Sequence, residues 1–212
     1  MKMEGKVKLY SYWRSSCSWR VRIALELKRA EYEYVPVNLL KGEQKASDFV
    51  DLSPSGMVPC LIIDDVTLSQ SIAILEYLEE TLPDGHILYP LDPRERALCR
   101  QMVMIIACDT QPLQNLHVVK AFGDKGSDWA KQVIINGLTA FDRLVRMYGG
   151  AYCFGDTISV ADICLVPQLY NARRFGIEDI ETRWPKLFEV EKRLSTHPAF
   201  ICAHPDQQPD RA

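Results

Sequence analysis

The opening third of the chain changes hydrophobic period twice. Residues 8–12 alternate in polarity and are rich in aromatic side chains, which predicts a strand. Residues 16–29 place apolar side chains at the spacing of a helix. Residues 32–37 predict a second strand, and Pro36, which lacks an amide hydrogen, is expected to put that strand at a sheet edge. The pattern therefore predicts a β-α-β unit.

A hairpin and a helix complete this region. An Asp-Asp pair separates two short apolar runs, residues 60–63 and 66–68, in the manner of a tight β-hairpin. Residues 71–80 then predict a short amphipathic helix. A β-α-β unit followed by a hairpin and a helix is the element order of a thioredoxin-like domain. We expect residues 1–83 to form this α/β domain.

The rest of the chain has a helical period. Residues 83–93 contain three prolines and one glycine, so we expect a linker over 84–93 and an all-helical domain over 94–212. Helices are expected over residues 94–122, 127–147, 159–174 and 185–196. Pro112 is expected to kink the first of these helices. The polar tail, residues 203–212, is expected to be extended or frayed.

One helix start is marked unusually clearly. Ser159 and Asp162 have the spacing of a capping box, in which each side chain binds the other residue's backbone amide. Ile158 and Ile163 occupy the positions of the accompanying hydrophobic staple. This motif serves folding, and we assign it no chemistry.

Composition excludes several functional classes. The net charge of −3 gives no reason to expect a nucleic acid partner. The seven cysteines contain no Cys-x-x-Cys pair, which argues against a disulfide framework or a metal site and favours a reducing cytoplasm. Residues 1–6 do not resemble a signal peptide, and the longest apolar run, residues 102–108, is too short to cross a bilayer. We expect a cytoplasmic protein without a membrane anchor.

The first candidate chemistry lies between the first strand and its helix. Ser15, Ser16 and Cys17 place two hydroxyls and a thiol at the start of a helix, where the helix dipole stabilises anions. A thiolate is such an anion, so the segment suits the activation of a thiol. That thiol is either the one on Cys17 or that of a small ligand. Helix capping alone would also explain a serine here.

Two further segments carry candidate binding groups. Val58-Pro59 stands directly before the predicted third strand, and a cis bond there would turn the Val58 amide and carbonyl toward an extended peptide. An ordinary trans proline turn is the alternative. Gln70 and Ser71 open the helix at 71–80, with Ser71 as the expected N-cap. The hydroxyl and the amides of this helix start are suited to a carboxylate.

Together, Ser-Ser-Cys, Val-Pro and Gln-Ser resemble the glutathione site of cytosolic glutathione transferases, and further segments resemble the zeta class. The similar segments are 14–25 (RSSCSWRVRIAL), 36–44 (PVNLLKGEQ), 111–115 (QPLQN), 165–168 (LVPQ) and 208–210 (QPD). The resemblance extends over nearly the whole chain. It implies the two-domain fold of that family, with the thioredoxin-like domain first and the helical domain second.

The resemblance also implies a set of site residues. Ser15 should donate a hydrogen bond to the glutathione sulfur, with Ser16 and Cys17 beside it as catalytic residues. The residues that should bind glutathione are Ser15, Ser16, Cys17, Gln44, Val58, Pro59, Gln70, Ser71, Gln111, Asn115, Leu116 and His117. Arg14 and Arg174 should bind a diacid substrate. No metal is implied. Asp109 departs from the family pattern, and we expect it to point outward.

The activity implied by the resemblance is cis–trans isomerisation of maleylacetoacetate to fumarylacetoacetate, a step of tyrosine and phenylalanine catabolism. The family usually forms homodimers. Isomerisation of maleylpyruvate and processing of α-haloacids use the same thiolate and stay open. So do a non-catalytic interaction protein and a thiol oxidoreductase that uses Cys17, although no resolving cysteine lies two residues away.

Overall fold

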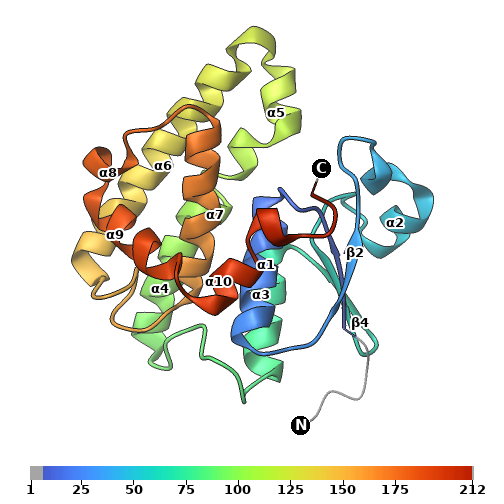
Figure 1. Ribbon diagram of the computed structural model, residues 1–212, viewed down its shortest axis with the longest axis horizontal. Coiled ribbons are helices and arrows are strands. Elements are labelled where there is room, and N and C mark those ends of the chain that lie inside the picture. Colours follow the sequence, from blue (N-terminus) through green and yellow to red (C-terminus); the bar gives the residue numbers. More distant parts are fainter. Residues whose placement is uncertain (1–6, 212) are drawn as a thin grey trace. The chain divides into compact units, whose positions relative to one another are not determined.

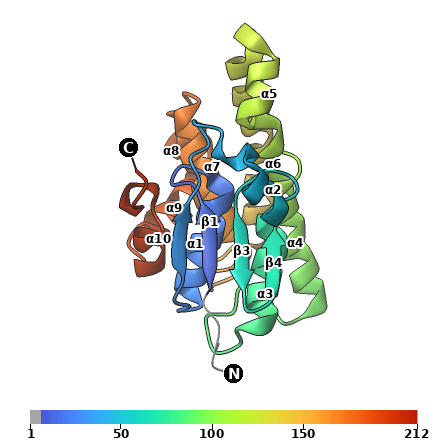
Figure 2. The same ribbon diagram turned by 90° about the vertical axis from the view of Figure 1, so that its right-hand side faces the viewer.

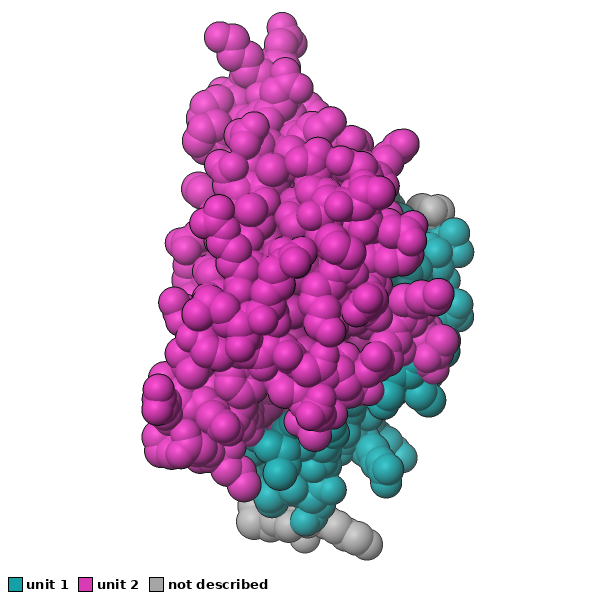
Figure 3. All heavy atoms as spheres, turned by 90° about the vertical axis from the view of Figure 1, so that its left-hand side faces the viewer, with its two compact units in different colours: residues 1–87, 197–212 teal, residues 88–196 magenta. Residues whose placement is uncertain are grey.

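The computed structural model describes residues 7–211, so residues 1–6 and Ala212 lie outside the described part, and with them the expectation about the amino-terminal segment. The chain forms two compact units (Figure 3). Unit 1 runs to Ile87 and also includes the segment from His197, whereas unit 2 is Leu88–Thr196. This division differs from the predicted boundaries chiefly at the carboxyl end, because the last segment packs within unit 1.

Unit 1 contains the predicted β-α-β unit and hairpin (Figure 2). Its strands are β1 (Lys8–Ser11), β2 (Glu33–Pro36), β3 (Cys60–Ile63) and β4 (Val66–Ser69). They form one sheet in the order β2-β1-β3-β4, with only the β1–β2 pair parallel. The strand that contains Pro36 is at the sheet edge, as expected from its missing donor.

Helices cover this sheet. The helical segments of unit 1 are α1 (Ser16–Leu27), η1 (Glu43–Lys45), α2 (Ser47–Leu52), α3 (Ser71–Thr81), α10 (Pro198–Cys202) and η4 (Pro205–Gln207). The apolar side chains of α1 are buried on all sides because α1 packs against both α3 and α10 (Figure 1). The order of strands and helices confirms the predicted thioredoxin-like architecture.

Unit 2 is helical, as predicted. Its segments are α4 (Pro93–Ala107), η2 (Pro112–Gln114), α5 (Leu116–Ala121), η3 (Gly123–Lys125), α6 (Gly126–Tyr148), α7 (Val160–Arg174), α8 (Ile180–Arg183) and α9 (Pro185–Leu194). No helix among residues 7–211 is long and apolar enough to span a membrane. The same residues contain no cluster of metal-ligating side chains.

The prediction of one kinked helix over 94–122 is wrong. The helix ends at Ala107, and Pro112 begins a separate turn of 3₁₀-helix because its ring cannot donate a backbone hydrogen bond. The Thr110 hydroxyl also donates to the Ile105 carbonyl over 2.7 Å, which closes the end of the helix. Buried Gln114 and Gln168 then exchange two amide hydrogen bonds and fix the new turn against α7.

The expectation of a frayed tail over 203–212 is also wrong. Ala203 is fully buried, and Gln208 is buried and donates to the carbonyls of Cys202 and His204, each over 2.9 Å. The imidazole of His204 packs edge-on against Trp19 of α1, with 5.2 Å between ring centroids. Trp19 lies far from His204 in sequence, so local polarity gave no sign of this contact.

The capping box forms as predicted. The Asp162 carboxylate accepts hydrogen bonds from the amides of Ser159 (2.8 Å) and Cys153 (2.9 Å) and from the Ser159 hydroxyl (2.9 Å). Burial raises the pKa of Asp162, and the donors from Cys153 and Ser159 oppose that shift. The charged form of the buried carboxylate is therefore stabilised by these donors, and the buried amides of Cys153 and Ser159 have the carboxylate as their acceptor.

We predict that Asp162→Ala lowers the free energy of unfolding by about 3 kcal/mol, because it leaves two buried amides without an acceptor. Urea unfolding followed by circular dichroism measures this loss. Glu189→Ala, at an exposed carboxylate of α9, is the control and should change stability by less than about 0.5 kcal/mol. Equal effects of the two substitutions would contradict the prediction.

Candidate functional site

The first part of the site is the turn between β1 and α1. Ser15 is the N-cap of α1, and its Oγ accepts a hydrogen bond from the Ser18 amide over 3.2 Å. The Ser15 amide donates to the Tyr12 carbonyl over 2.9 Å, which closes the turn. Since the hydroxyl acts as an acceptor within the cap, its own hydrogen is available to an outside acceptor. Capping and a binding role for Ser15 are therefore compatible.

More donors converge at this helix start. Within residues 7–211, the amides of Ser16 and Cys17 make no backbone hydrogen bond, as expected for the first turn of a helix. Ser15 and Cys17 are partly exposed, whereas the Ser16 side chain is buried. The Ser15 hydroxyl, two amides and the helix dipole thus favour an anion at one point.

The second part of the site precedes β3. The Val58–Pro59 peptide is cis, as the sequence suggested. In the described part of the chain, neither the amide nor the carbonyl of Val58 makes a hydrogen bond. Val58 thus retains one donor and one acceptor at the amino end of a central strand. Such a pair suits the backbone of a bound peptide.

The third part is the start of α3. Gln70, and not Ser71 as expected, is the N-cap, and its side chain makes no capping bond. Its φ of 71° lies in the left-handed region, which costs a non-glycine residue about 1–3 kcal/mol. Ser71 is the first helical residue. The amides of this helix start therefore have no capping side chain, so they suit an external anion.

A buried arginine lies beneath Ser71. Nη1 of Arg20 donates to the Ser71 Oγ over 3.2 Å, and Arg20 is 1% exposed. The Arg20 Nε and Nη2 atoms have no hydrogen-bond partner among residues 7–211. Because Ser71 accepts from Arg20, its own hydrogen is left to donate. The buried cation also adds positive charge near the start of α3. Sequence reasoning missed Arg20, although the two arginines within the otherwise apolar segment 19–25 were a usable signal.

Gln44 lies in η1 and is half-buried, and its side-chain Oε1 atom is buried without a partner among the described residues. The Gln44 carbonyl would be 3.1 Å from a side-chain carbon added at Gly56, whose φ of +59° also favours glycine. Glycine at position 56 therefore permits the close approach of η1 to the segment that leads to Val58.

The sheet register brings these parts to one end of unit 1. Tyr10 of β1 pairs with Cys60 of β3, which in turn pairs with Ser69 of β4. Ser15 follows β1, Val58 precedes β3 and Gln70 follows β4, so all three lie beyond this row of paired residues. Tyr12, Val58 and Phe49 of α2 share one buried apolar cluster, which joins the segments.

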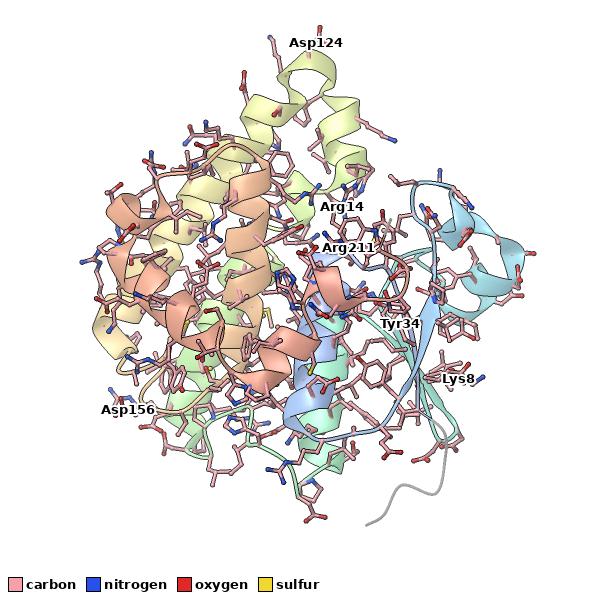
Figure 4. The ribbon with its side chains drawn as sticks, in the orientation of Figure 1. Lys8, Arg14, Tyr34, Asp124, Asp156 and Arg211 are labelled. Atoms are coloured by element: carbon pink, nitrogen blue, oxygen red, sulfur yellow. The ribbon has the colours of Figure 1, made fainter. Side chains whose placement is uncertain are left out.

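The remaining sequence-predicted residues lie as follows. The Arg14 guanidinium stacks over the Trp13 ring, 5.4 Å from its centroid (Figure 4). In unit 2, Gln111 and Asn115 flank η2 and are half-buried, and Leu116 and His117 begin α5 and are exposed.

The exposed Arg174 ends α7, and its Nη1 donates to the Asn171 Oδ1 over 3.1 Å. Asp109 is exposed, in line with the expected outward orientation. The roles of all these residues stay predictions.

The thiols differ sharply in environment. Burial raises the pKa of Cys60 to about 11 and that of Cys99 to about 12, so both stay protonated and inert. Burial also raises the pKa of Cys153. Cys60 therefore behaves as a small apolar residue, as its position after the proline suggested. Cys17 is the one cysteine of the described chain that lies at the helix start.

Comparison with known proteins agrees with this geometry. Residues 5–80 match the family model for the glutathione S-transferase N-terminal domain, and residues 127–193 match the model for its C-terminal domain. Maleylacetoacetate isomerase from Mus musculus is 47% identical over 97% of this chain and 95% of its own length. A zeta-class glutathione S-transferase from Euphorbia esula is 44% identical over 97% and 93%.

Solved structures agree as well. A bacterial maleylpyruvate isomerase described as a zeta-class glutathione S-transferase superposes with a TM-score of 0.92 at 38% identity, covering 97% of this chain and 100% of its own. Maleylacetoacetate isomerase from Anaeromyxobacter dehalogenans with bound glutathione has a TM-score of 0.89 at 40% identity, covering 98% of both chains. The chain thus belongs to the glutathione S-transferase family and, within it, to the zeta class.

Proposed function

We propose that this protein is a glutathione-dependent cis–trans isomerase that converts maleylacetoacetate to fumarylacetoacetate in tyrosine and phenylalanine catabolism. The observation that carries the proposal is the Ser15 cap, whose hydroxyl hydrogen is free to donate beside the first amides of α1. It occurs in a chain that is 47% identical to curated maleylacetoacetate isomerases over nearly its whole length.

The described groups fit glutathione. A tripeptide with a thiol and two carboxylates needs an anion site for sulfur, a backbone partner and a carboxylate site. Ser15 suits the sulfur, Val58 suits the peptide backbone, and Gln70 with Ser71 suits a carboxylate. The buried, unpaired Oε1 of Gln44 suits an amide or ammonium hydrogen. We assign Ser16, Cys17 and Pro59 to the walls of the same site.

When bound, glutathione supplies a thiolate whose addition to and departure from the double bond allows rotation about a single bond. The protein's part is to keep that sulfur ionised near neutral pH. An unperturbed thiol has a pKa of about 8.5, so lowering it by about two units requires roughly 2.7 kcal/mol. A hydrogen bond from Ser15 to a charged acceptor supplies about 1.5–3 kcal/mol, and the α1 dipole adds about 0.3–1 kcal/mol.

The substrate carries two carboxylates, and its reacting end gains negative charge in the transition state. We assign Arg14 and Arg174 to these charges, because positioned cations stabilise developing anions. Gln111, Asn115, Leu116 and His117 of unit 2 are assigned to closing the site. The proposal requires no general base, so His117 is given no role in proton transfer.

The alternatives differ in substrate or in class. Maleylpyruvate and small α-haloacids would use the same sulfur site, and one structural relative is a maleylpyruvate isomerase. An interaction protein would not need a free hydroxyl hydrogen at Ser15. An oxidoreductase would need the partly exposed Cys17 as its nucleophile.

We also infer a cytoplasmic homodimer. All seven cysteines are free thiols, which suits a reducing compartment. Homodimers are the usual assembly of the family that the chain belongs to, and light scattering on purified protein measures the mass.

The purified protein should isomerise maleylacetoacetate only when glutathione is present, as followed by absorbance. Maleylpyruvate and dichloroacetate run in parallel rank the competing substrates by kcat/KM. Turnover that is indifferent to glutathione, or absent for every substrate, would overturn the proposed function.

Ser15→Ala should lower kcat/KM by about 100-fold and raise the pKa of bound glutathione by about one to two units, since the charged sulfur loses its hydroxyl donor. Absorbance of the thiolate against pH measures that pKa. Cys17→Ala is the matched variant in the first turn of α1, and it should keep most of the activity. Near-complete loss in Cys17→Ala would instead favour the oxidoreductase.

Arg174→Ala should raise KM for the diacid by about tenfold and leave the glutathione affinity unchanged, because one substrate carboxylate loses its cation. Steady-state kinetics with each component varied in turn separate the two effects. Arg173→Ala is the matched control, because the neighbouring guanidinium is already bound to Glu191 by two bonds of 2.6 Å. Equal kinetics for Arg174→Ala and wild type would remove Arg174 from the site.

A further inference from the structure

Arg22 of α1 is fully buried and bonds to backbone carbonyls and a hydroxyl. Its guanidinium donates to the carbonyls of Trp13 (3.0 Å), Tyr12 (3.4 Å) and Ala203 (3.1 Å), and to the Ser11 hydroxyl (3.2 Å). Burial lowers the pKa of Arg22 to about 10, which still leaves it charged at neutral pH. One buried cation thus holds two successive carbonyls of the turn that leads to Ser15.

Asp210 also binds this turn. One oxygen of its carboxylate accepts the Trp13 amide over 3.0 Å, and the other accepts the Tyr34 hydroxyl over 2.6 Å. Burial, followed by this bond to Asp210, raises the pKa of Tyr34, which therefore stays a donor. Arg22 thus binds the carbonyls of both peptide groups that flank Trp13, and Asp210 binds the amide of the Tyr12–Trp13 peptide group.

The link to Ser15 is short. The Tyr12 carbonyl, which accepts from Arg22, also accepts from the Ser15 amide over 2.9 Å. A shift of this carbonyl would move the N-cap residue, and with it the hydroxyl that carries the proposed function. One of the two anchors is distant in sequence, since Asp210 lies 197 positions after Trp13.

The carboxyl-terminal segment is itself held in place. Ala203, which bonds to Arg22, is buried, and Gln208 folds the chain back by donating to the carbonyls of Cys202 and His204. Figure 4 labels Tyr34, which lies in β2 of unit 1, and Arg211, the residue after Asp210. The position of the Asp210 carboxylate therefore follows from this fold-back and from its bonds to the Trp13 amide and the Tyr34 hydroxyl.

We propose that Arg22 and Asp210 are positioning residues of the thiol site: together they set the conformation of the turn at Tyr12–Ser15, and the segment after His197 is a working part of that site. The inference rests on the proposed role of Ser15. It assigns a function to the Gln208–Asp210 motif, which the proposed chemistry does not otherwise use.

The test compares Asp210→Asn and Asp210→Ala with Asp206→Asn, a control in the same segment whose carboxylate pairs with Arg211 at 3.1 Å. Three quantities are measured: the pKa of bound glutathione from thiolate absorbance, the hydrogen exchange of residues 12–18 by mass spectrometry, and the midpoint of thermal unfolding. Asp210→Asn keeps the size of the side chain, so it covers the case in which Asp210→Ala does not fold.

We expect both Asp210 variants to raise the pKa of bound glutathione by about 0.5–1 unit and, through the smaller thiolate fraction, to lower kcat at neutral pH by about 1.5-fold to threefold. Exchange of residues 12–18 should accelerate, while KM for the diacid stays within about twofold of wild type. Asp206→Asn should match wild type in all of these. Tyr34→Phe, which removes only the second bond to Asp210, should give a smaller shift in the same direction.

An unchanged thiol pKa in Asp210→Asn, with only the unfolding midpoint lowered, would overturn the inference and leave Asp210 a purely structural residue. Failure of the proposed function looks different, because wild type would then bind glutathione as a thiolate without isomerising any substrate. The pKa and exchange measurements still judge the inference in that case. A wild type that holds glutathione as an uncharged thiol would overturn it.

Discussion

The bond from the Ser18 amide to the Ser15 hydroxyl joins the folding of unit 1 to its chemistry. A cap stabilises a helix by giving one unpaired amide an acceptor. Because the hydroxyl accepts this bond, its own hydrogen is left to donate to a group outside the helix. The same side chain thus begins α1 and prepares an anion site. Helix stability and the proposed thiol activation therefore depend on the same side chain.

The sheet determines where the other binding groups lie. The paired row of Tyr10, Cys60 and Ser69 aligns the ends of β1, β3 and β4. The loop after β1, the loop before β3 and the loop after β4 therefore lie at the same end of the sheet. The loops supply different groups: a hydroxyl, a free peptide unit and an uncapped helix start. In the proposed function, these three groups bind the tripeptide at successive points along its length. The strain at Gln70 is consistent with a backbone kept for binding and not for stability.

The elements that the sequence predicted well are those whose signals are local. Strand alternation, the Asp-Asp hairpin and the Ser159 capping box each depend on neighbours within a few residues. The break after Ala107 was missed because a proline predicts a disturbed helix without saying whether the helix bends or stops. The order of the tail was missed because Ala203 and Asp210 find their partners near the other end of the chain. No local pattern carries that information.

Unit 1 is built from both ends of the chain, with all of unit 2 between them. A ribosome releases the sheet and α1 first and the segment after His197 last. Until then, the Arg22 guanidinium lacks the Ala203 carbonyl, and the Trp13 amide lacks its carboxylate. A nascent chain therefore cannot complete the turn at Ser15 before the helical unit has been translated. Given the proposed role of Ser15, the order of synthesis delays the onset of thiol activation.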